Sequence, residues 1–543
     1  MEYLEKYNLW LEKVNDKKLK DELVSMTDEQ KSTAFFKDIE FGTAGLRGTV
    51  GAGSNCMNIY TVGRATRAVC EYMKKIGGKS IAISYDNRIM SYDFARLVAG
   101  ICVKYGIKVY LADKMMPTPY LSYMVRYYGA DMGVMITASH NPREYNGYKV
   151  YGNDGCQLLD EPSLEIMKIA DTLDLFDLSF EDVDESVKTR KIVLTDNVIL
   201  ESYKTEVKKQ SRNKIENIKV VFSALNGTGI NTLPVILEEC GAEIVYNEVQ
   251  CKADENFTTC PSPNPEKLEV FETSLPIARN CGADLIILSD PDADRVGLEV
   301  LHNGEYVHLS GNEAGVLMVD YLLKTRNVSN GVICKSIVST GLADKIAESK
   351  GARCKNVLTG FKYIGEFIKK LENDGREGEF VLGFEESYGY LVGTHVRDKD
   401  ATVASLVITE MASEYKKQGF TLVDRLEALY REFGYYEHIV YSYKFAGSEG
   451  ADKMKNILSG LRANAPTSFG GIKVEEVVDY ANGVDDLPKA NVLIYNLEGG
   501  SQVVVRPSGT EPLIKTYITL SKTKEENAKN LELIKAGIAE IVG

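Results

Sequence analysis

Residues 132–142 read Met-Gly-Val-Met-Ile-Thr-Ala-Ser-His-Asn-Pro, and they decide the class of fold that this chain adopts. The first five form a short apolar run, which is typical of a buried parallel strand. Ligands bind at the carboxyl ends of such strands, so Ser139 and His140 are expected to lie in a crevice. Lys149 follows and adds a cation. The three side chains indicate a site where a hydroxyl is activated or its developing charge is stabilised.

An ordinary turn is the simpler alternative for this segment. Ser and Asn often satisfy local backbone groups in turns, and Pro142 can end a strand. A serine-hydrolase site is disfavoured, because no G-x-S-x-G elbow occurs in the chain.

The composition limits the classes of function. The chain has 543 residues, 44% hydrophobic and 26% charged, which suits a globular protein of several domains. A net charge of −14 and a pI near 5.2 argue against nucleic acid as a partner, so an anionic substrate would need a local cationic cleft. No apolar run approaches the roughly 18–20 residues of a membrane span, and residues 1–6 do not resemble a signal peptide. Ten cysteines without a C-x-x-C pair suggest reduced thiols in the cytoplasm.

The order of the expected elements predicts repeated α/β units. Apolar residues at helical spacing predict an amphipathic helix at the N-terminus, packed on the body of the protein. Strand patterns at 80–85 and 107–111 flank a helix pattern at 91–104, and the strand before Ser139 follows. The pattern restarts near 218 and again near 312, whereas the part from about Tyr436 is less regular. We therefore expect a mixed α/β protein with four domains, at residues 1–205, 206–308, 309–433 and 434–543.

Three carboxylates follow a second apolar run at 285–288. Asp290, Asp292 and Asp294 occupy alternate positions and would repel one another unless a hard cation drew them together. An EF-hand is excluded, because its sixth position would be Arg295 and its twelfth Leu301. A solvated acidic turn is the simpler alternative. Three protein oxygens leave an octahedral cation unsaturated, and Mg²⁺ with one phosphate oxygen fits this pattern best.

A third cluster has the composition of an anion site. Arg506 offers a bidentate guanidinium, Ser508 and Thr510 offer hydroxyls, Gly509 opens the backbone N–H groups, and Lys515 follows closely. Ordinary turn chemistry is again the alternative.

A fourth segment, Gly383-Phe384-Glu385-Glu386-Ser387-Tyr388-Gly389, is expected to be a loop after a strand at 380–382. Its acceptors and its hydroxyl suit hydrogen bonding to the hydroxyl groups of a polyol. Carboxylates in a glycine-flanked turn explain it about as well.

Together, the four segments resemble the α-D-phosphohexomutases in content, order and spacing. Further support comes from the Gly42-Thr43-Ala44-Gly45-Leu46-Arg47-Gly48 segment, from Tyr85-Asp86-Asn87-Arg88, and from the turn Pro117-Thr118-Pro119. The resemblance spans residues 40 to 520. It implies three mixed α/β domains of related topology and a smaller α+β domain around a central cleft.

The resemblance also implies roles for individual residues. Ser139 would be carried as phosphoserine, and Mg²⁺ would be held by Asp290, Asp292, Asp294 and one phosphoserine oxygen. The other implied roles are proton transfer (His140, Lys149), charge stabilisation (Arg295), binding near the phosphoserine (Arg47), sugar recognition (Thr359, Gly360, Glu385, Ser387), phosphate binding (Arg506, Ser508, Gly509, Thr510, Lys515) and further cations (Lys335, Arg397, Lys399).

The expected reaction converts glucose 1-phosphate to glucose 6-phosphate through glucose 1,6-bisphosphate. Glu385 and Ser387 resemble the glucose- and mannose-phosphate members, so we also expect activity on mannose phosphate, because one hydroxyl's configuration gives limited discrimination. A phosphopentomutase and a catalytically silent phosphosugar-binding relative remain open alternatives. A monomer and a homodimer are both compatible with the sequence.

Overall fold

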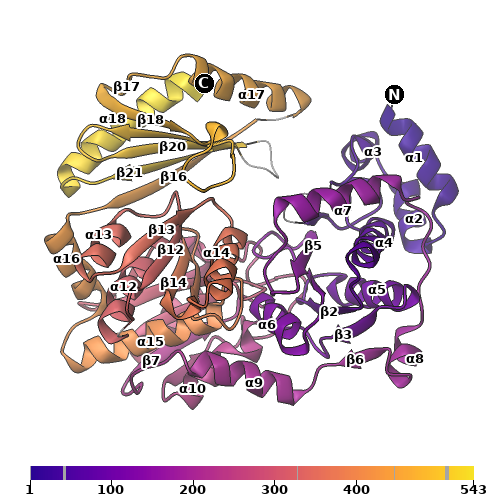
Figure 1. The fold of residues 1–543 in the computed structure, drawn as a ribbon, viewed down its shortest axis with the longest axis horizontal. Helices are drawn as coiled ribbons and strands as arrows, with labels where there is room; N and C mark the ends of the chain where they lie inside the picture. Colours follow the sequence, from indigo (N-terminus) through magenta and orange to yellow (C-terminus); the bar gives the residue numbers. More distant parts are fainter. Residues whose placement is uncertain (1, 41–44, 327, 446, 508–512, 543) are drawn as a thin grey trace.

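The computed structural model describes residues 2–40, 45–326, 328–445, 447–507 and 513–542 (Figure 1). The chain forms four sheets in sequence order. Three belong to mixed α/β domains, and the fourth belongs to a smaller C-terminal α+β domain, as the sequence predicts. No helix in the described ranges is long and apolar enough to span a membrane.

Three helices precede the first sheet where one was expected: α1 (Glu2–Lys13), α2 (Lys17–Ser25) and α3 (Asp28–Phe35). The side chains of Asp16 and Thr27 accept hydrogen bonds from backbone N–H groups and so cap the second and third helices. Trp10 is 2% exposed and makes edge-on contacts with Phe35, Tyr60 and Phe176. The extension therefore has its own small core against the first domain.

The first sheet has the strand order β1-β5-β4-β2-β3-β6. Its four strands β4, β2, β3 and β6 are parallel, whereas β5 runs antiparallel to β4 and to β1. The strands are β1 (Leu46–Thr49), β2 (Ser80–Tyr85), β3 (Lys108–Leu111), β4 (Met132–Ile136), β5 (Tyr145–Gly152) and β6 (Ile192–Leu194). The helices are α4 (Ile59–Ile76), α5 (Ser91–Lys104), α6 (Thr118–Tyr128), α7 (Asp160–Thr172), α8 (Val183–Lys188) and α9 (Asn197–Lys208).

The second sheet has the order β11-β10-β9-β7-β8. Its central strand β9 is buried at every position, as its apolar run predicts. The strands are β7 (Lys219–Ser223), β8 (Glu243–Tyr246), β9 (Leu285–Ser289), β10 (Val296–His302) and β11 (Glu305–Leu309). The helical segments are η1 (Thr228–Asn231), α10 (Leu233–Glu239), η2 (Leu268–Phe271) and α11 (Leu275–Cys281).

The third sheet has the order β13-β12-β14-β15, with β15 antiparallel. The strands are β12 (Val332–Ser336), β13 (Arg353–Val357), β14 (Phe380–Glu385) and β15 (Gly389–Val392). The helices are α12 (Gly311–Thr325), α13 (Leu342–Ser349), α14 (Phe361–Asn373), η3 (Glu377–Glu379), α15 (Ala401–Lys417) and α16 (Leu422–Phe433).

The C-terminal domain is more regular than its sequence pattern suggests. Its sheet has the order β16-β21-β20-β19-β18-β17, and all its pairings are antiparallel. The strands are β16 (Glu437–Lys444), β17 (Ser468–Phe469), β18 (Ile472–Asp479), β19 (Leu493–Leu497), β20 (Gln502–Pro507) and β21 (Leu513–Leu520). The helical segments are α17 (Gly447–Ala463), η4 (Tyr480–Asn482) and α18 (Lys524–Val542). One face of the sheet packs against α17 and α18, and the other contacts the third domain.

Candidate active site

Ser139 lies three residues beyond β4, in a tight and buried turn. Its backbone is left-handed, with φ of 53°, and its side chain is 3% exposed. The Ser139 Oγ donates to Asp290 Oδ2 at 2.9 Å and lies 3.1 Å from His140 Nδ1. A strained backbone at a buried strand exit is typical of a functional position. The hydroxyl therefore joins the first domain to the carboxylate loop of the second.

Arg88 holds the loop that carries Ser139. Its guanidinium donates to the carbonyl oxygens of Ser139, Asn141 (2.6 Å) and Pro142 (2.9 Å). Its own Nε lies 3.2 Å from Asp86 Oδ2, and both side chains are fully buried. A planar guanidinium can serve several acceptors at once. In the sequence, residues 85–88 stood out only as part of a family pattern. The hydrogen bonds by which Arg88 holds the Ser139 loop were not predicted.

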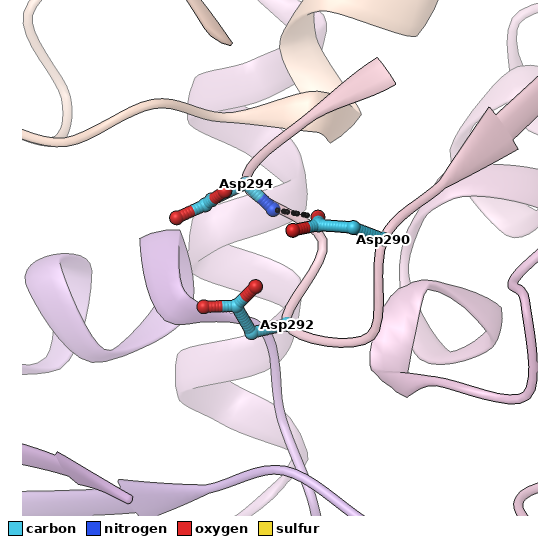
Figure 2. A group of neighbouring side chains, drawn as sticks. All are labelled: Asp290, Asp292 and Asp294. Atoms are coloured by element: carbon cyan, nitrogen blue, oxygen red, sulfur yellow. Dashed lines mark hydrogen bonds between the residues drawn. The ribbon is translucent and has the colours of Figure 1, made fainter. Parts of the chain in front are cut away.

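Asp290, Asp292 and Asp294 meet in the loop between β9 and β10 (Figure 2). One oxygen of each lies within 4.8 Å of the others, and all three side chains are buried. The loop is tight because Asp290 Oδ1 accepts from the backbone N–H groups of Asp294 and Arg295, both at 3.0 Å. Three carboxylates are thus held together where water has little access.

Cations and a hydroxyl from other segments surround this triad. The Lys149 Nζ, on β5, lies 2.9 Å from Asp292 Oδ2 and 3.5 Å from Asp294 Oδ2. The Lys399 Nζ lies 3.2 Å from the same Asp294 oxygen. Thr118 donates from its Oγ1 to Asp292 Oδ2 at 2.8 Å. Lys399 was expected only as a further cation, and the structure brings it into contact with the triad.

The triad has the donor set of a divalent cation site. The Asp292 Oδ1 and Asp294 Oδ1 are buried and make no hydrogen bond within the described part of the chain. Burial and the neighbouring carboxylates raise the pKa of Asp290 well above its ordinary value. Burial opposes ionisation of Asp292 too, but Lys149 and hydrogen bonds hold its pKa below the usual value. Mg²⁺ and Ca²⁺ prefer carboxylate oxygens as ligands. Three neighbouring carboxylates, with two oxygens that accept no hydrogen bond from a described residue, therefore fit such an ion.

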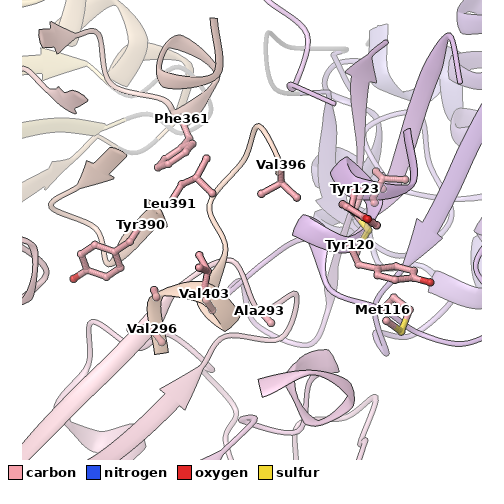
Figure 3. Close-up of a cluster of buried hydrophobic side chains, with 14 of the residues drawn as sticks. Met116, Tyr120, Tyr123, Ala293, Val296, Phe361, Tyr390, Leu391, Val396 and Val403 are labelled. Atoms are coloured by element: carbon pink, nitrogen blue, oxygen red, sulfur yellow. The ribbon is translucent and has the colours of Figure 1, made fainter. Parts of the chain in front are cut away.

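A continuous apolar core fixes the loops of the first three domains relative to one another (Figure 3). Figure 3 shows Tyr120 of the first domain, Ala293 of the triad loop, and Val396 and Val403 of the third domain around one region. Ala293 is itself left-handed, with φ of 49°, and is fully buried. The triad is therefore supported from several elements.

The remaining cations near Ser139 differ in their partners. The Arg47 side chain donates to Asn141 Oδ1 at 3.1 Å, next to the Ser139 turn. Arg295 is bound to Glu266 Oε1 at 2.6 Å, and its Nε lies 3.9 Å from Asp294. Burial, reinforced by Arg295 and Arg47, lowers the pKa of His140 well below its ordinary value. His140 is therefore neutral at pH 7.

The segment expected to be a loop after residue 382 is part of a β-hairpin. Strand β14 continues through Glu385 and pairs with β15 from Gly389, because Phe384 packs fully buried in the core. Glu385 Oε1 accepts from the N–H of Gly360 at 2.8 Å, which joins two of the expected sugar-binding segments. Thr359 Oγ1 is buried without a hydrogen-bond partner in the described chain. Ser387 lies in the hairpin turn.

Two other expected cations pair with carboxylates outside the triad. Arg397 is 1% exposed, and its Nη2 lies 3.1 Å from Glu372 Oε2. Lys335, at the end of β12, lies 3.0 Å from Asp344 Oδ2. Both make structural ion pairs.

The expected phosphate residues are described only in part. Arg506 on β20 and Lys515 on β21 are direct cross-strand partners. Ser508, Gly509 and Thr510 lie outside the described residues, as do Gly42, Thr43 and Ala44. The cross-strand pair supplies two adjacent positive charges.

Three family models match the chain in succession. The alpha/beta/alpha domains I, II and III of phosphoglucomutase/phosphomannomutase match residues 38–176, 200–303 and 310–433. The chain belongs to the phosphoglucomutase/phosphomannomutase family. The four segments that indicated phosphohexomutases thus led to the correct superfamily, whose members are mutases of the isomerase class.

Relatives of this family resemble the chain over most of its length. A phosphoglucomutase of Staphylococcus epidermidis is 37% identical, covering 95% of this chain and 96% of the relative. A phosphoglucomutase of Staphylococcus haemolyticus is 38% identical, covering 94% of this chain and 96% of the relative. In fold, the chain is similar to a phosphoglucomutase/phosphomannomutase family protein of Burkholderia thailandensis, with a TM-score of 0.71 and 17% identity. The match covers 93% of this chain and 97% of that chain. The open form of parafusin, a phosphoglucomutase from Paramecium, has a TM-score of 0.67 at 18% identity, and the match covers 93% of this chain and 94% of that chain.

Proposed function

We propose that this chain is a phosphoglucomutase that interconverts glucose 1-phosphate and glucose 6-phosphate through phosphoserine at Ser139. The observation that carries the proposal is the 2.9 Å hydrogen bond from Ser139 Oγ to Asp290, within a triad whose other carboxylates face Lys149. The similarity to curated phosphoglucomutases over nearly the whole chain supports glucose phosphate as the substrate. Activity on mannose phosphate is expected as a side reaction.

The triad would hold Mg²⁺ together with one phosphoserine oxygen. When bound, the ion would neutralise charge on the phosphoryl oxygens, which is the main requirement of phosphoryl transfer. Lys149 and Lys399, which contact Asp292 and Asp294, keep further positive charge at the same place.

The residues around Ser139 account for alignment and proton movement. Phosphoryl transfer from Ser139 Oγ to a sugar hydroxyl requires that the hydroxyl lose a proton and that Oγ regain one. His140 Nδ1, 3.1 Å from Oγ, is placed to carry that proton. Arg88 and Arg47 hold the turn through its carbonyl groups and Asn141. The pre-set turn reduces the entropy lost on reaching the reactive geometry.

The other expected segments would bind the substrate. Glu385, Ser387, Thr359 and Gly360 would contact sugar hydroxyls. Arg506 and Lys515, with Ser508, Gly509 and Thr510, would hold the phosphate that is not reacting. Glucose 1,6-bisphosphate would form, reorient and return its other phosphate to Ser139. Sugar phosphates are thus the proposed partners. The ten free cysteines are consistent with a cytoplasmic location.

The substrate assignment is tested by comparing kcat/KM for glucose 1-phosphate, mannose 1-phosphate and ribose 1-phosphate with Mg²⁺ present. We expect glucose 1-phosphate to give the highest value and mannose 1-phosphate the next. A higher value for ribose 1-phosphate would identify a phosphopentomutase instead. No turnover of any of them would support a silent relative.

A further inference from the structure

A pocket in the C-terminal domain lies apart from the candidate active site. It has a volume of about 520 Å³. Its walls come from helix α17, from the segment 481–491 and from Pro507 at the end of β20. We call it the rear pocket. Its size is in the range of ordinary small-molecule sites.

The rear pocket opens on the opposite face of the sheet from Arg506. Side chains alternate between the two faces of a strand. On β20, Val503 and Val505 belong to the core under α17 and α18, whereas Val504 belongs to the core shared with the third domain. Arg506 therefore shares the face of Val504, and Pro507 shares the face of Val505. A ligand in the rear pocket would therefore not lie on the face of the sheet that carries Arg506.

The charges that line the rear pocket are all positive. Lys455, Arg462 and Lys489 line it, and no acidic residue is among the described lining residues. Arg462 is already bound to Asp479 at 2.9 Å and to Asn491 at 2.8 Å. Neither Lys455 nor Lys489 has a salt bridge to any described residue, in a chain whose net charge is −14. Both lysines are exposed, so two ammonium groups without a described salt-bridge partner line one cavity.

The rest of the lining is apolar or can form hydrogen bonds. Met454, Leu458 and Ala490 offer an apolar surface, and the hydroxyl of Ser459 and the amide of Asn491 lie in the same lining. Point-like ammonium groups suit a phosphate, and the apolar part suits a small carbon body.

We propose that the rear pocket is a binding site for a small organic phosphate, held by Lys455 and Lys489. This site goes beyond the proposed mutase function and does not depend on it. The phosphate contacts the two ammonium groups, and the body of the ligand lies on the apolar wall.

Affinity labelling with pyridoxal 5′-phosphate tests the proposal on the whole protein. Its aldehyde condenses with a lysine amine, releasing water, and borohydride reduces the imine to a stable secondary amine. Because a cationic pocket concentrates anions locally, peptide mapping should find Lys455 or Lys489 labelled about tenfold or more above Lys473 and Lys529, which are likewise exposed but do not line the pocket. Inorganic pyrophosphate should protect both pocket lysines.

Matched controls separate phosphate binding from simple lysine reactivity. Pyridoxal has the same ring and aldehyde without the phosphate and should label the pocket lysines no more than Lys473. Lys489→Gln should lower labelling of Lys455 severalfold, whereas Lys529→Gln should leave it unchanged. Equal labelling by pyridoxal, labelling in proportion to exposure, or labelling confined to Lys149 and Lys399 would each overturn the proposal.

Discussion

At the residue scale, one buried arginine determines the shape of the Ser139 turn. Arg88 donates to three carbonyl groups of that turn, and lysine in its place would keep the charge but lose the fork of donors. Loss of buried hydrogen bonds worth about 1–3 kcal/mol should lower kcat roughly ten- to hundredfold in Arg88→Lys. Steady-state kinetics with glucose 1-phosphate measure this effect.

The matched control is Arg96→Lys. Arg96 is partly exposed and pairs with Asp184 at 3.0 Å on the helix side of the same domain. Its substitution should leave kcat unchanged. If Arg88→Lys retained full kcat, the clamp would not be needed for catalysis.

A second residue-scale prediction concerns a buried carboxyl. Glu299 on β10 is 5% exposed, and its Oε2 makes no hydrogen bond to a described residue. Burial, opposed by Arg279, raises the pKa of Glu299 from 4.5 to about 7. Between those values the unfolded state releases the proton while the folded state keeps it, so stability falls as pH rises. The loss should reach up to about 3 kcal/mol above pH 7.

Melting temperatures of the protein and of Glu299→Gln at pH 5 and pH 8 check this sign. The variant should be more stabilised, relative to the unmodified chain, at pH 8 than at pH 5. Exposed Glu348→Gln serves as the control and should show no pH-dependent difference. The same difference in melting temperature at both pH values would contradict a raised pKa of Glu299 in the folded protein.

The sequence could predict some site residues because their chemistry is local. Asp290, Asp292 and Asp294 are two residues apart, and Ser139, His140 and Lys149 lie around one strand exit. Arg88 and Thr118 are different, because they act across 51 and 174 residues. No local pattern shows which distant group they contact, so their functions needed the structure.

At the scale of elements, the N-terminal helices depend on one aromatic cluster. Trp10 contacts Phe35 of α3, Tyr60 of α4 and Phe176 at ring distances of 5.5–5.8 Å. Trp10→Ala should cost roughly 3–5 kcal/mol in that cluster and release the helices locally. Limited proteolysis should then cut within residues 2–35 sooner than in the unmodified chain.

Leu9→Ala is the control, because Leu9 is 47% exposed and lies on the same helix. It should be cut at the same rate as the unmodified chain. Equal resistance of Trp10→Ala would show that the cluster does not hold the extension.

Elements with strong apolar runs were predictable to their ends, whereas others were not. Strands β2 and β4 begin and end where the sequence predicts. Strand β14 runs three residues further than expected, because pairing with β15 overrides the turn signal of Gly383 and Glu385. The C-terminal sheet was underestimated, because strands exposed on one side, such as β16 and β18, lack continuous apolar runs.

At the scale of the whole molecule, the site exists only where domains meet. Asp292 of the second domain accepts hydrogen bonds from Lys149 and Thr118 of the first, while Lys399 of the third contacts Asp294.

Asp292→Asn keeps an oxygen but removes a charge, so kcat should fall by about a hundredfold or more, with a higher Mg²⁺ requirement. Mg²⁺ titration of activity measures this, with exposed Asp21→Asn as control. An unchanged Mg²⁺ titration would place the ion elsewhere.

The central claim is that Ser139 carries the phosphoryl group. Intact-mass measurement and peptide mapping, after incubation with glucose 1,6-bisphosphate and Mg²⁺, test it most directly. The account predicts one phosphoryl group per chain, located on Ser139, and none on Ser139→Ala, which should still bind glucose 1-phosphate but not turn it over. A chain that never gains a phosphoryl group, or a Ser139→Ala variant that retains full activity, would contradict it.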